Sequence, residues 1–367
     1  MNRFELIIKP LSERKNKVFA ERDMISPDTP PRHLSDRARD TVETLVPLIL
    51  EARREGRSVM LTFGAHTIKN GMASTLIALM EEGWCTHLAT NGAGIIHDWE
   101  LAFQGQTSED VRANVCRGEF GTWQETGFNL NLALNVGAWR GFGYGESVGR
   151  LVADDGLQIP STEELETFAA EHMRDDPQQS AAALDLCTVI RRFGLQPGFL
   201  EVKHRYPQYG IQAAAVRLGI PFTAHPMFGH DIIYTHPMNC GAAVGRTAER
   251  VFLRFADSVA GLTDGVYMSV GSAVMSPMVF EKSLSMSQNL ALQRGETIHG
   301  HRIFVVDLAE STWDWNQSGE PPMANPAYYL RYCKTFSRMG GQMSYTTADN
   351  RDFLLALYQE LSKQTLR

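Results

Sequence analysis

The sequence lacks the cysteine arrangements that mark a disulfide framework or a zinc site. Its five cysteines are odd in number and widely scattered, and none forms a Cys-x-x-Cys pair. We therefore expect reduced thiols, as in a cytoplasmic protein. The positions are Cys85, Cys116, Cys187, Cys240 and Cys333.

Long apolar runs and basic segments are also missing. The first ten residues hold only the short apolar run 6–8 and no signal-peptide pattern, and no stretch of about 18 apolar residues occurs elsewhere. The formal net charge is -7, spread over segments of mixed sign, whereas a phosphate backbone calls for a basic face. We predict a cytoplasmic protein with no membrane span and no nucleic-acid partner.

Two nucleotide-binding motifs are absent as well. No Gly-x-Gly-x-x-Gly follows a predicted strand, because the glycine-rich run 141–149 follows a helix. No Gly-Lys-Ser or Gly-Lys-Thr occurs, which disfavours phosphoryl transfer by a P-loop enzyme. Any nucleotide site must therefore be built from other loops.

What the sequence does contain is the usual material of a globular core. The chain has 367 residues, 43% of them hydrophobic and 21% charged, which suffices for one large domain or two modest ones. Three prolines within residues 24–33 predict an extended connector. Ser35 caps a predicted helix that Pro47 should kink and Gly56 should end. We expect an N-terminal extension over 1–57 and one domain over 58–367.

Within 58–367, short apolar runs alternate with helical patterns. Strands are predicted at 59–63, 86–90, 222–224, 266–270 and 303–306. Helices are predicted at 67–82, from near Asp98, and at 122–139, 162–173, 180–193, 208–218 and 350–364. This alternation predicts an α/β fold with a single core, doubly wound, with a mostly parallel Rossmann-like sheet and helices on both faces.

Three loops that follow predicted strands are rich in small residues. They span 64–71, 91–98 and 271–273. Ligands bind at the carboxyl ends of parallel strands, and glycine lets a backbone approach a diphosphate closely. Small residues also serve in tight turns without any ligand. Three such loops at one sheet edge favour a nucleotide, and NAD above others.

Residues 59 to about 315 resemble the deoxyhypusine synthase family, which shares an NAD-binding superfamily with the sirtuins. The resemblance lies in the order and spacing of five segments, which are 61–66, 91–94, 228–231, 270–273 and 305–310. It implies NAD contacts from the first, second and fourth segments and from Asp307, and an amine-binding aspartate near Asp231. It also implies a homo-oligomer, dimer or tetramer. The predicted NAD-binding residues are Gly64, Ala65, His66, Asn91, Gly92, Ala93, Gly94, Gly271, Ser272 and Asp307.

One departure from that family concerns the reaction. The family forms an imine on the lysine of a Trp-Gly-Lys segment, and the corresponding region here reads Gly340-Gly341-Gln342. We take Lys69 as the candidate nucleophile instead, because a desolvated lysine can attack a carbonyl. Contact with a phosphate, or a solvated lysine on the helix surface, are the alternatives.

The other candidates would bind substrate or move protons. His230 and Asp231 are assigned general acid–base work. A metal site that would also include His225 and His236 is the alternative, and we expect none. His97, Asp98, Glu310 and Trp313 are assigned to a small-molecule substrate, although Asp98 can instead cap a helix. Trp313 and Trp315 can line the site or, with Tyr328, Tyr329 and Tyr345, contact another subunit.

These residues lead to a hypothesis and two alternatives. The hypothesis is an NAD-dependent enzyme that acts on a small amine or alcohol by hydride transfer, with a possible group transfer through an imine. The first alternative consumes NAD as sirtuins do, but their zinc-binding Cys-x-x-Cys pairs are absent. The second is a nucleotide sensor or scaffold without catalysis.

Overall fold

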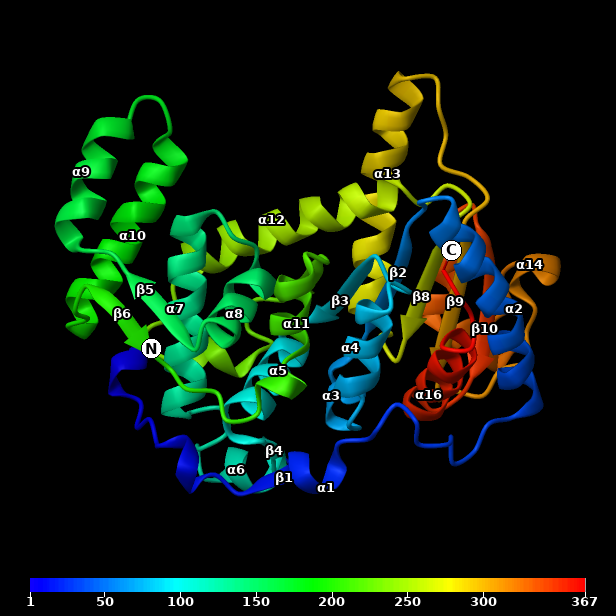
Figure 1. Cartoon of the computed structure of the whole chain (residues 1–367), viewed down its shortest axis with the longest axis horizontal. Helices are drawn as coiled ribbons and strands as arrows, with labels where there is room; N and C mark the ends of the chain where they lie inside the picture. The colour runs from blue at the N-terminus through cyan, green and yellow to red at the C-terminus, as the bar shows by residue number, and fades with distance from the viewer. Residues whose placement is uncertain (367) are drawn as a thin grey trace. The chain divides into compact units, whose positions relative to one another are not determined.

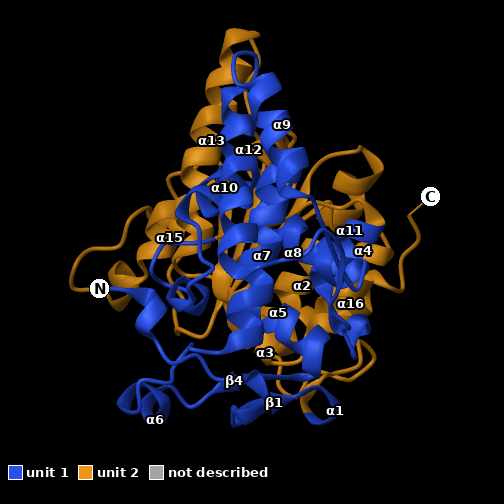
Figure 2. Ribbon diagram, turned by 90° about the vertical axis from the view of Figure 1, so that its left-hand side faces the viewer, with its two compact units in different colours: residues 1–22, 95–217, 226–251 blue, residues 23–94, 218–225, 252–367 orange. Residues whose placement is uncertain are grey.

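The computed structural model describes residues 1–366 as two compact units, coloured separately in Figure 2. Unit 1 comprises residues 1–22, 95–217 and 226–251, and unit 2 comprises residues 23–94, 218–225 and 252–367. The chain thus passes between the units several times. This grouping differs from the division at residue 57 expected from the sequence.

Unit 2 is built around a six-stranded, entirely parallel sheet (Figure 1). The strands lie in the order β10-β9-β8-β2-β3-β7. In chain order this is the 3-2-1-4-5-6 arrangement of a doubly wound dinucleotide-binding sheet, read from β7. The predicted fold class is confirmed. The strands are β2 (Val59–Phe63), β3 (His87–Asn91), β7 (Phe222–His225), β8 (Val266–Val270), β9 (Arg302–Asp307) and β10 (Gln342–Thr347).

Helices cover both faces of this sheet. On one face α2 packs against β2, β8 and β10, and α16 packs on α2 and α4. On the other face Phe255 of α12 and Phe280 of α13 pack on Tyr267 of β8. The helices of unit 2 are α2 (Asp36–Arg54), α3 (Ala65–Lys69), α4 (Ala73–Glu81), α13 (Met275–Gln293), α14 (Trp315–Ser318), α15 (Arg331–Phe336), α16 (Asn350–Leu361) and η5 (Pro326–Tyr329).

Unit 1 is mostly helical, with two antiparallel strand pairs. Its centre is α7, whose residues 129–139 are all buried. Four helices, α1, α5, α11 and α12, contain residues of both units. The strands and helices are β1 (Asn16–Phe19), β4 (Gln106–Glu109), β5 (Gly156–Ile159), β6 (Gly198–Glu201), α1 (Ala20–Asp23), α5 (Gly92–Gln104), α6 (Val111–Cys116), α7 (Gln124–Arg140), α8 (Tyr144–Ala153), α9 (Thr162–His172), α10 (Pro177–Phe193), α11 (Ile211–Leu218), α12 (Gly241–Ala260), η1 (Arg3–Glu5), η2 (Leu11–Glu13), η3 (Pro207–Tyr209) and η4 (Ile232–Thr235).

Two local predictions were wrong, and one strand was missed. The helix expected at 67–82 is two helices, because Gly71 adopts a φ of 84° between α3 and α4. The helix expected from near Asp98 begins at Gly92, directly after β3. The region around Gly341 leads into strand β10, which had not been predicted.

The aromatic residues expected at a subunit contact are divided by burial. Trp315 and Tyr345 belong to the hydrophobic core of unit 2, so they are not free for such a contact. Tyr329 is exposed. The homo-oligomer remains a prediction. Among residues 1–366, no helix is both long and apolar enough to cross a membrane.

Candidate functional site

The candidate cofactor site lies where the strand order of unit 2 reverses. From β2 the chain proceeds outward through β3 to β7, and then returns to β8 on the other side of β2. The loops after β2 and β8 therefore diverge from adjacent strand ends. In open α/β sheets this switch point forms the ligand-binding crevice.

Two glycines meet at this point. A Cβ added to Gly64 would lie 2.1 Å from the carbonyl oxygen of Gly271, so no side chain fits there. Gly64 N–H also donates to the Val270 carbonyl at 3.3 Å. Gly271 has a φ of 61°, which favours glycine, and its N–H donates to the Val306 carbonyl at 2.8 Å. The sequence predicted both residues at the site, and the structure brings their backbones into contact.

The second predicted loop is a direct passage from strand to helix. The Asn91 side chain accepts the Gly94 N–H at 2.9 Å and so stabilises the first turn of α5. A Cβ on Gly94 would lie 2.3 Å from Oγ1 of Thr90, which donates to the Phe63 carbonyl at 2.9 Å. The half-buried Ala93 lies between these glycines. With the positive end of the α5 dipole, the loop offers backbone donors to an anion.

A buried hydroxyl network supports the loop after β8. Ser272 Oγ accepts the Ser276 N–H at 3.3 Å, at the start of the long helix α13. Ser276 Oγ lies 2.8 Å from the Tyr267 hydroxyl, which accepts a hydrogen bond from Thr62 Oγ1 at 3.0 Å. Tyr267 is fully buried, and burial raises the pKa of its hydroxyl. The network joins β2, β8 and α13 beneath residues 271–273.

His66 and Lys69 occupy the short helix α3 that follows Gly64. The His66 side chain is exposed overall. Loss of some of its hydration lowers the pKa of its imidazole, and the positive charge of Lys69 lowers it further. Lys69 is half-buried in the last turn of α3. The sequence did not single out Asn350, whose Nδ2 donates to Thr67 Oγ1 at 3.2 Å and which accepts from Asn70 at 2.9 Å. Asn350 also lies beside Gly271, so the loop after β10 joins the same edge. Asn350 is the first residue of α16, three residues after the end of β10, and no pattern in the sequence marks it.

The remaining predicted residues of unit 2 follow β9. Asp307 ends that strand half-buried, and its Oδ1 accepts the Leu308 N–H at 2.7 Å. Glu310 is exposed. Trp313 is half-buried and donates from Nε1 to the Gly319 carbonyl at 2.9 Å. The carboxylate between the two tryptophans, Asp314, caps α14. Because Trp315 is buried in the hydrophobic core of unit 2, Trp313 is the one of the two rings that can still line a site.

In unit 1 the geometry favours structural roles for His97 and Asp98. Asp98 is fully buried, and its two oxygens accept the backbone N–H groups of Ile211 and Gln212 at 2.8 and 3.1 Å. Asp98 belongs to α5, but its carboxyl caps the amino end of α11. Burial raises its pKa to about 6. His97 Nδ1 lies 2.7 Å from Oγ1 of Thr107. Nothing in these contacts supports a substrate role for either residue.

A buried carboxyl lies in the segment that leads into η4. Asp231 is 8% exposed, and its carboxyl interacts with the Tyr234 hydroxyl. Burial raises the Asp231 pKa to about 6, although the charge of His230 lowers it. Burial is the main cause of a raised pKa for the hydroxyl of the fully buried Tyr144, and the charge of the Asp231 carboxyl raises that pKa further. Such a carboxyl can exchange a proton near neutral pH or accept a bond from an ammonium group.

The histidines considered for a metal have other partners. His225 Nε2 lies 2.9 Å from Thr223 Oγ1, and His236 Nδ1 accepts the Met238 N–H at 3.1 Å. Within residues 1–366, no three His, Cys, Asp or Glu side chains come close enough together to hold a metal ion.

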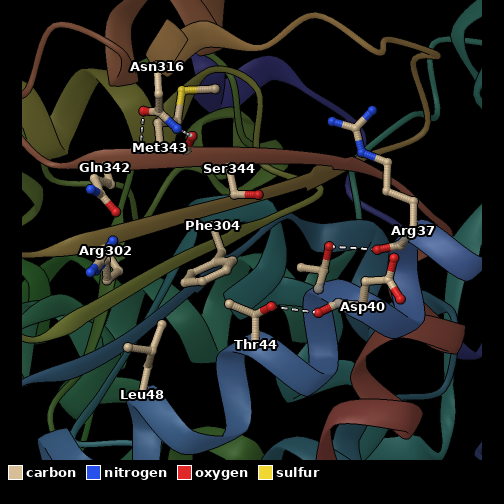
Figure 3. A pocket seen from close by; sticks show the side chains of 11 residues that line it. Arg37, Asp40, Thr44, Leu48, Arg302, Phe304, Asn316, Gln342, Met343 and Ser344 are labelled. Carbon is tan, nitrogen blue, oxygen red and sulfur yellow. Dashed lines mark hydrogen bonds between the residues drawn. The ribbon is translucent and has the colours of Figure 1, made fainter.

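A groove of about 320 Å³ lies elsewhere in unit 2, between α2 and the strands β9 and β10 (Figure 3). Arg302 and Gln342, the first residues of their strands, line one side, and Arg37 and Asp40 of α2 line the other. Arg37 donates to the carbonyls of Ser311 and Tyr345. The groove includes the amino ends of these strands, whereas the glycine loops follow the carboxyl ends, so it is not the predicted cofactor crevice.

No family model and no curated protein matches the chain. In structure it is similar to the ternary complex of AgrE with ornithine and NAD+, at 17% identity and a TM-score of 0.45, over 90% of this chain and 34% of that one. It is also similar to ArgZ, an arginine dihydrolase from cyanobacteria, at 15% identity and a TM-score of 0.42, over 89% and 33%. A third neighbour is a LOR/SDH protein from Methanococcus maripaludis S2, at 12% identity and a TM-score of 0.42, over 91% and 74%.

The chain spans about a third of the length of AgrE and ArgZ. Its resemblance to deoxyhypusine synthases stays a prediction. The assignment to the doubly wound α/β class rests on the chain's own strand order.

Proposed function

We propose that this protein is an NAD-dependent enzyme that oxidises a small amine or alcohol. The contact between Gly64 and Gly271 at the switch point of the sheet carries the proposal. A dinucleotide binds where backbones alone line the crevice, because side chains would keep its diphosphate away. Because Gly64 has no Cβ, its loop lies directly against the Gly271 loop, and the backbone amides of both loops can face one ligand.

The proposed cofactor contacts are divided among three strand ends. Gly64, Ala65 and the Gly271–Ser272 backbone would face the diphosphate, with the amino ends of α5 and α13 supplying positive dipoles. Asn91 would hold a ribose hydroxyl, since it stands where dinucleotide-binding sheets carry an acidic residue. When bound, NAD would supply a hydride acceptor for the carbon that bears the amine or hydroxyl.

The chain's own residues would supply the rest of the chemistry. Asp231, whose pKa is raised to about 6 by burial, is proposed as an acid–base group with His230. Its carboxyl can accept a hydrogen bond from the N–H of an amine or the O–H of an alcohol substrate. Lys69 is proposed to form the imine if group transfer follows oxidation.

Thermal unfolding of the full chain at increasing NAD tests cofactor binding. A ligand present at 100 times its Kd adds about 2.7 kcal/mol to the free energy of unfolding. We expect a concentration-dependent rise in Tm, and NADH absorbance with at least one member of a panel of small amines, amino acids and alcohols. An unchanged Tm at millimolar NAD would overturn the proposal. Release of nicotinamide without NADH would favour a sirtuin-like consumption of NAD.

A further inference from the structure

A line of hydrogen bonds crosses the buried interior of unit 2 beside the candidate site. Ser258 Oγ lies 2.7 Å from His87 Nδ1, and His87 Nε2 lies 2.9 Å from Thr223 Oγ1. The same Thr223 oxygen lies 2.9 Å from Nε2 of His225. Four side chains from α12, β3 and β7 therefore form one continuous hydrogen-bonded chain.

The line runs between the two ends of the strands. His87 is the first residue of β3, and His225 is the last residue of β7. The parallel register pairs His225 with Asn91, so the line ends beside the loop that opens α5. At its other end Ser258 is only half-buried, whereas His87, Thr223 and His225 are buried.

The surroundings keep both imidazoles neutral and shielded from water. The Phe255 ring meets each imidazole edge to face, with centroids 5.3 Å from His87 and 5.1 Å from His225. Burial lowers the pKa of each ring to about 3, and the charge of Arg254 further lowers that of His87. A neutral imidazole carries one N–H and one acceptor nitrogen, so it can receive a proton on one side while it releases one on the other.

The geometry points to a proton relay, in which His225, Thr223, His87 and Ser258 carry a proton from the carboxyl edge of the sheet to the half-buried end at Ser258. The relay's purpose rests on the proposed function, because oxidation of an amine or alcohol carbon releases a proton together with the hydride. These are relay residues, and none of them is assigned a contact with NAD or substrate.

The proton count closes without an added reactant. In the starting state His225 Nε2–H donates to Thr223, Thr223 O–H donates to His87 Nε2, and His87 Nδ1–H donates to Ser258. As Nδ1 of His225 gains a proton, each bridging proton moves one step, and the Ser258 hydroxyl releases one to solvent. The starting state is restored when the two imidazole rings turn over and the Thr223 and Ser258 hydroxyls rotate, so that the next proton passes in the same direction. In both states one histidine holds its proton on Nε2 and the other on Nδ1.

This complementarity can be measured without turnover. Long-range ¹H–¹⁵N correlation spectra of the full chain, labelled in its histidines, report which nitrogen of each ring is protonated. The substitutions H87Q and H225Q assign the two rings. We expect opposite tautomers for His87 and His225, or averaging between the two complementary states. Protons fixed on Nε2 of both rings would overturn the relay, because the Thr223 proton would then bridge neither ring.

Variants of Thr223 link the relay to turnover. Thr223→Val should lower kcat at least about tenfold, since proton-transfer groups commonly contribute 10²–10⁴-fold, while KM and the NAD-dependent rise in Tm stay unchanged. Thr223→Ser retains the hydroxyl and should keep the wild-type kcat. This variant tests the relay even if the valine variant folds poorly. Thr346→Val, which removes a buried hydroxyl bonded to Thr41, is the matched control.

The two proposals fail differently. Wild-type kcat in a folded Thr223→Val variant would overturn the relay while leaving NAD-dependent oxidation intact. If no NADH forms with any substrate, the proposed function fails, and the tautomers still decide whether the relay exists.

Discussion

Substitution of Gly64 by alanine probes the switch point with a single methyl group. The new Cβ would lie 2.1 Å from the Gly271 carbonyl oxygen and 3.2 Å from its carbon. Real Cβ atoms essentially never approach closer than 3.0 Å, so the two loops must separate by at least about 0.9 Å. Both obstacles are backbone atoms, which cannot move aside as the end of a flexible side chain does.

The cost should appear in stability and in cofactor binding. Overpacking of this kind lowers the free energy of unfolding by about 1–3 kcal/mol, which corresponds to a fall in Tm of a few degrees. The displaced loops would no longer offer their amides at the required spacing. We therefore expect Gly64→Ala to lose most of the stabilisation that NAD gives the wild type, about 2.7 kcal/mol at 100 times its Kd.

The assay is thermal unfolding of both proteins at matched NAD concentrations, with NAD affinity measured by calorimetry. Gly245→Ala is the control, because Gly245 lies exposed in α12 and an added Cβ meets no atom within 4 Å. That change should stabilise the protein by up to about 1 kcal/mol and leave NAD binding unchanged. Wild-type NAD affinity in a folded Gly64→Ala variant would refute the assignment of the switch point as the cofactor site.

Three further predictions address single residues. Lys69→Arg should abolish borohydride trapping of substrate on the protein, because a guanidinium keeps its charge but is not a nucleophile; trapping that persists would exclude Lys69. Asn91→Asp should shift the ratio of NADP to NAD affinity about tenfold towards NAD, since a carboxylate repels a 2′-phosphate, and an unchanged ratio would place the ribose elsewhere. For Asp231, the raised pKa means that the folded state holds its proton more firmly than the unfolded chain does, so stability falls as pH rises from about 4 through about 6. Asp231→Asn should thus raise Tm at pH 8 and leave it unchanged at pH 4, and an equal effect at both pH values would contradict the assigned pKa.

Local signals in the sequence predicted the elements that depend on neighbouring residues. The Ser35 hydroxyl accepts the Ala38 N–H, and the Ser161 hydroxyl accepts the Glu164 N–H, as their positions before helical patterns indicated. The apolar run 266–270 is β8 without any shift of its ends. Caps and buried strands are predictable because the residues that stabilise them are adjacent in the chain or apolar throughout.

The errors arose where a distant part of the fold decides the local structure. Strand β10 contains Gln342, Ser344 and two threonines, which gave no apolar run, yet it pairs with β9 along its whole length. Asp98 looked like the cap of its own helix, but its carboxyl reaches the amides of α11. Tertiary pairing supplied the hydrogen bonds in both cases, and no local pattern contains them.

The histidine line likewise could not be found from spacing along the chain, because strand pairing creates it. From the sequence, His225 belonged with His230 and His236, its neighbours in number. In the structure its partner is Thr223, and through it His87, because β3 pairs with β7 and residues two apart on a strand share a face. A polar side chain inside a fully buried strand must find a hydrogen bond, and only strand order decides with whom. Two buried strands that each carry a histidine and a threonine are therefore the sequence signal to examine once a strand order is known.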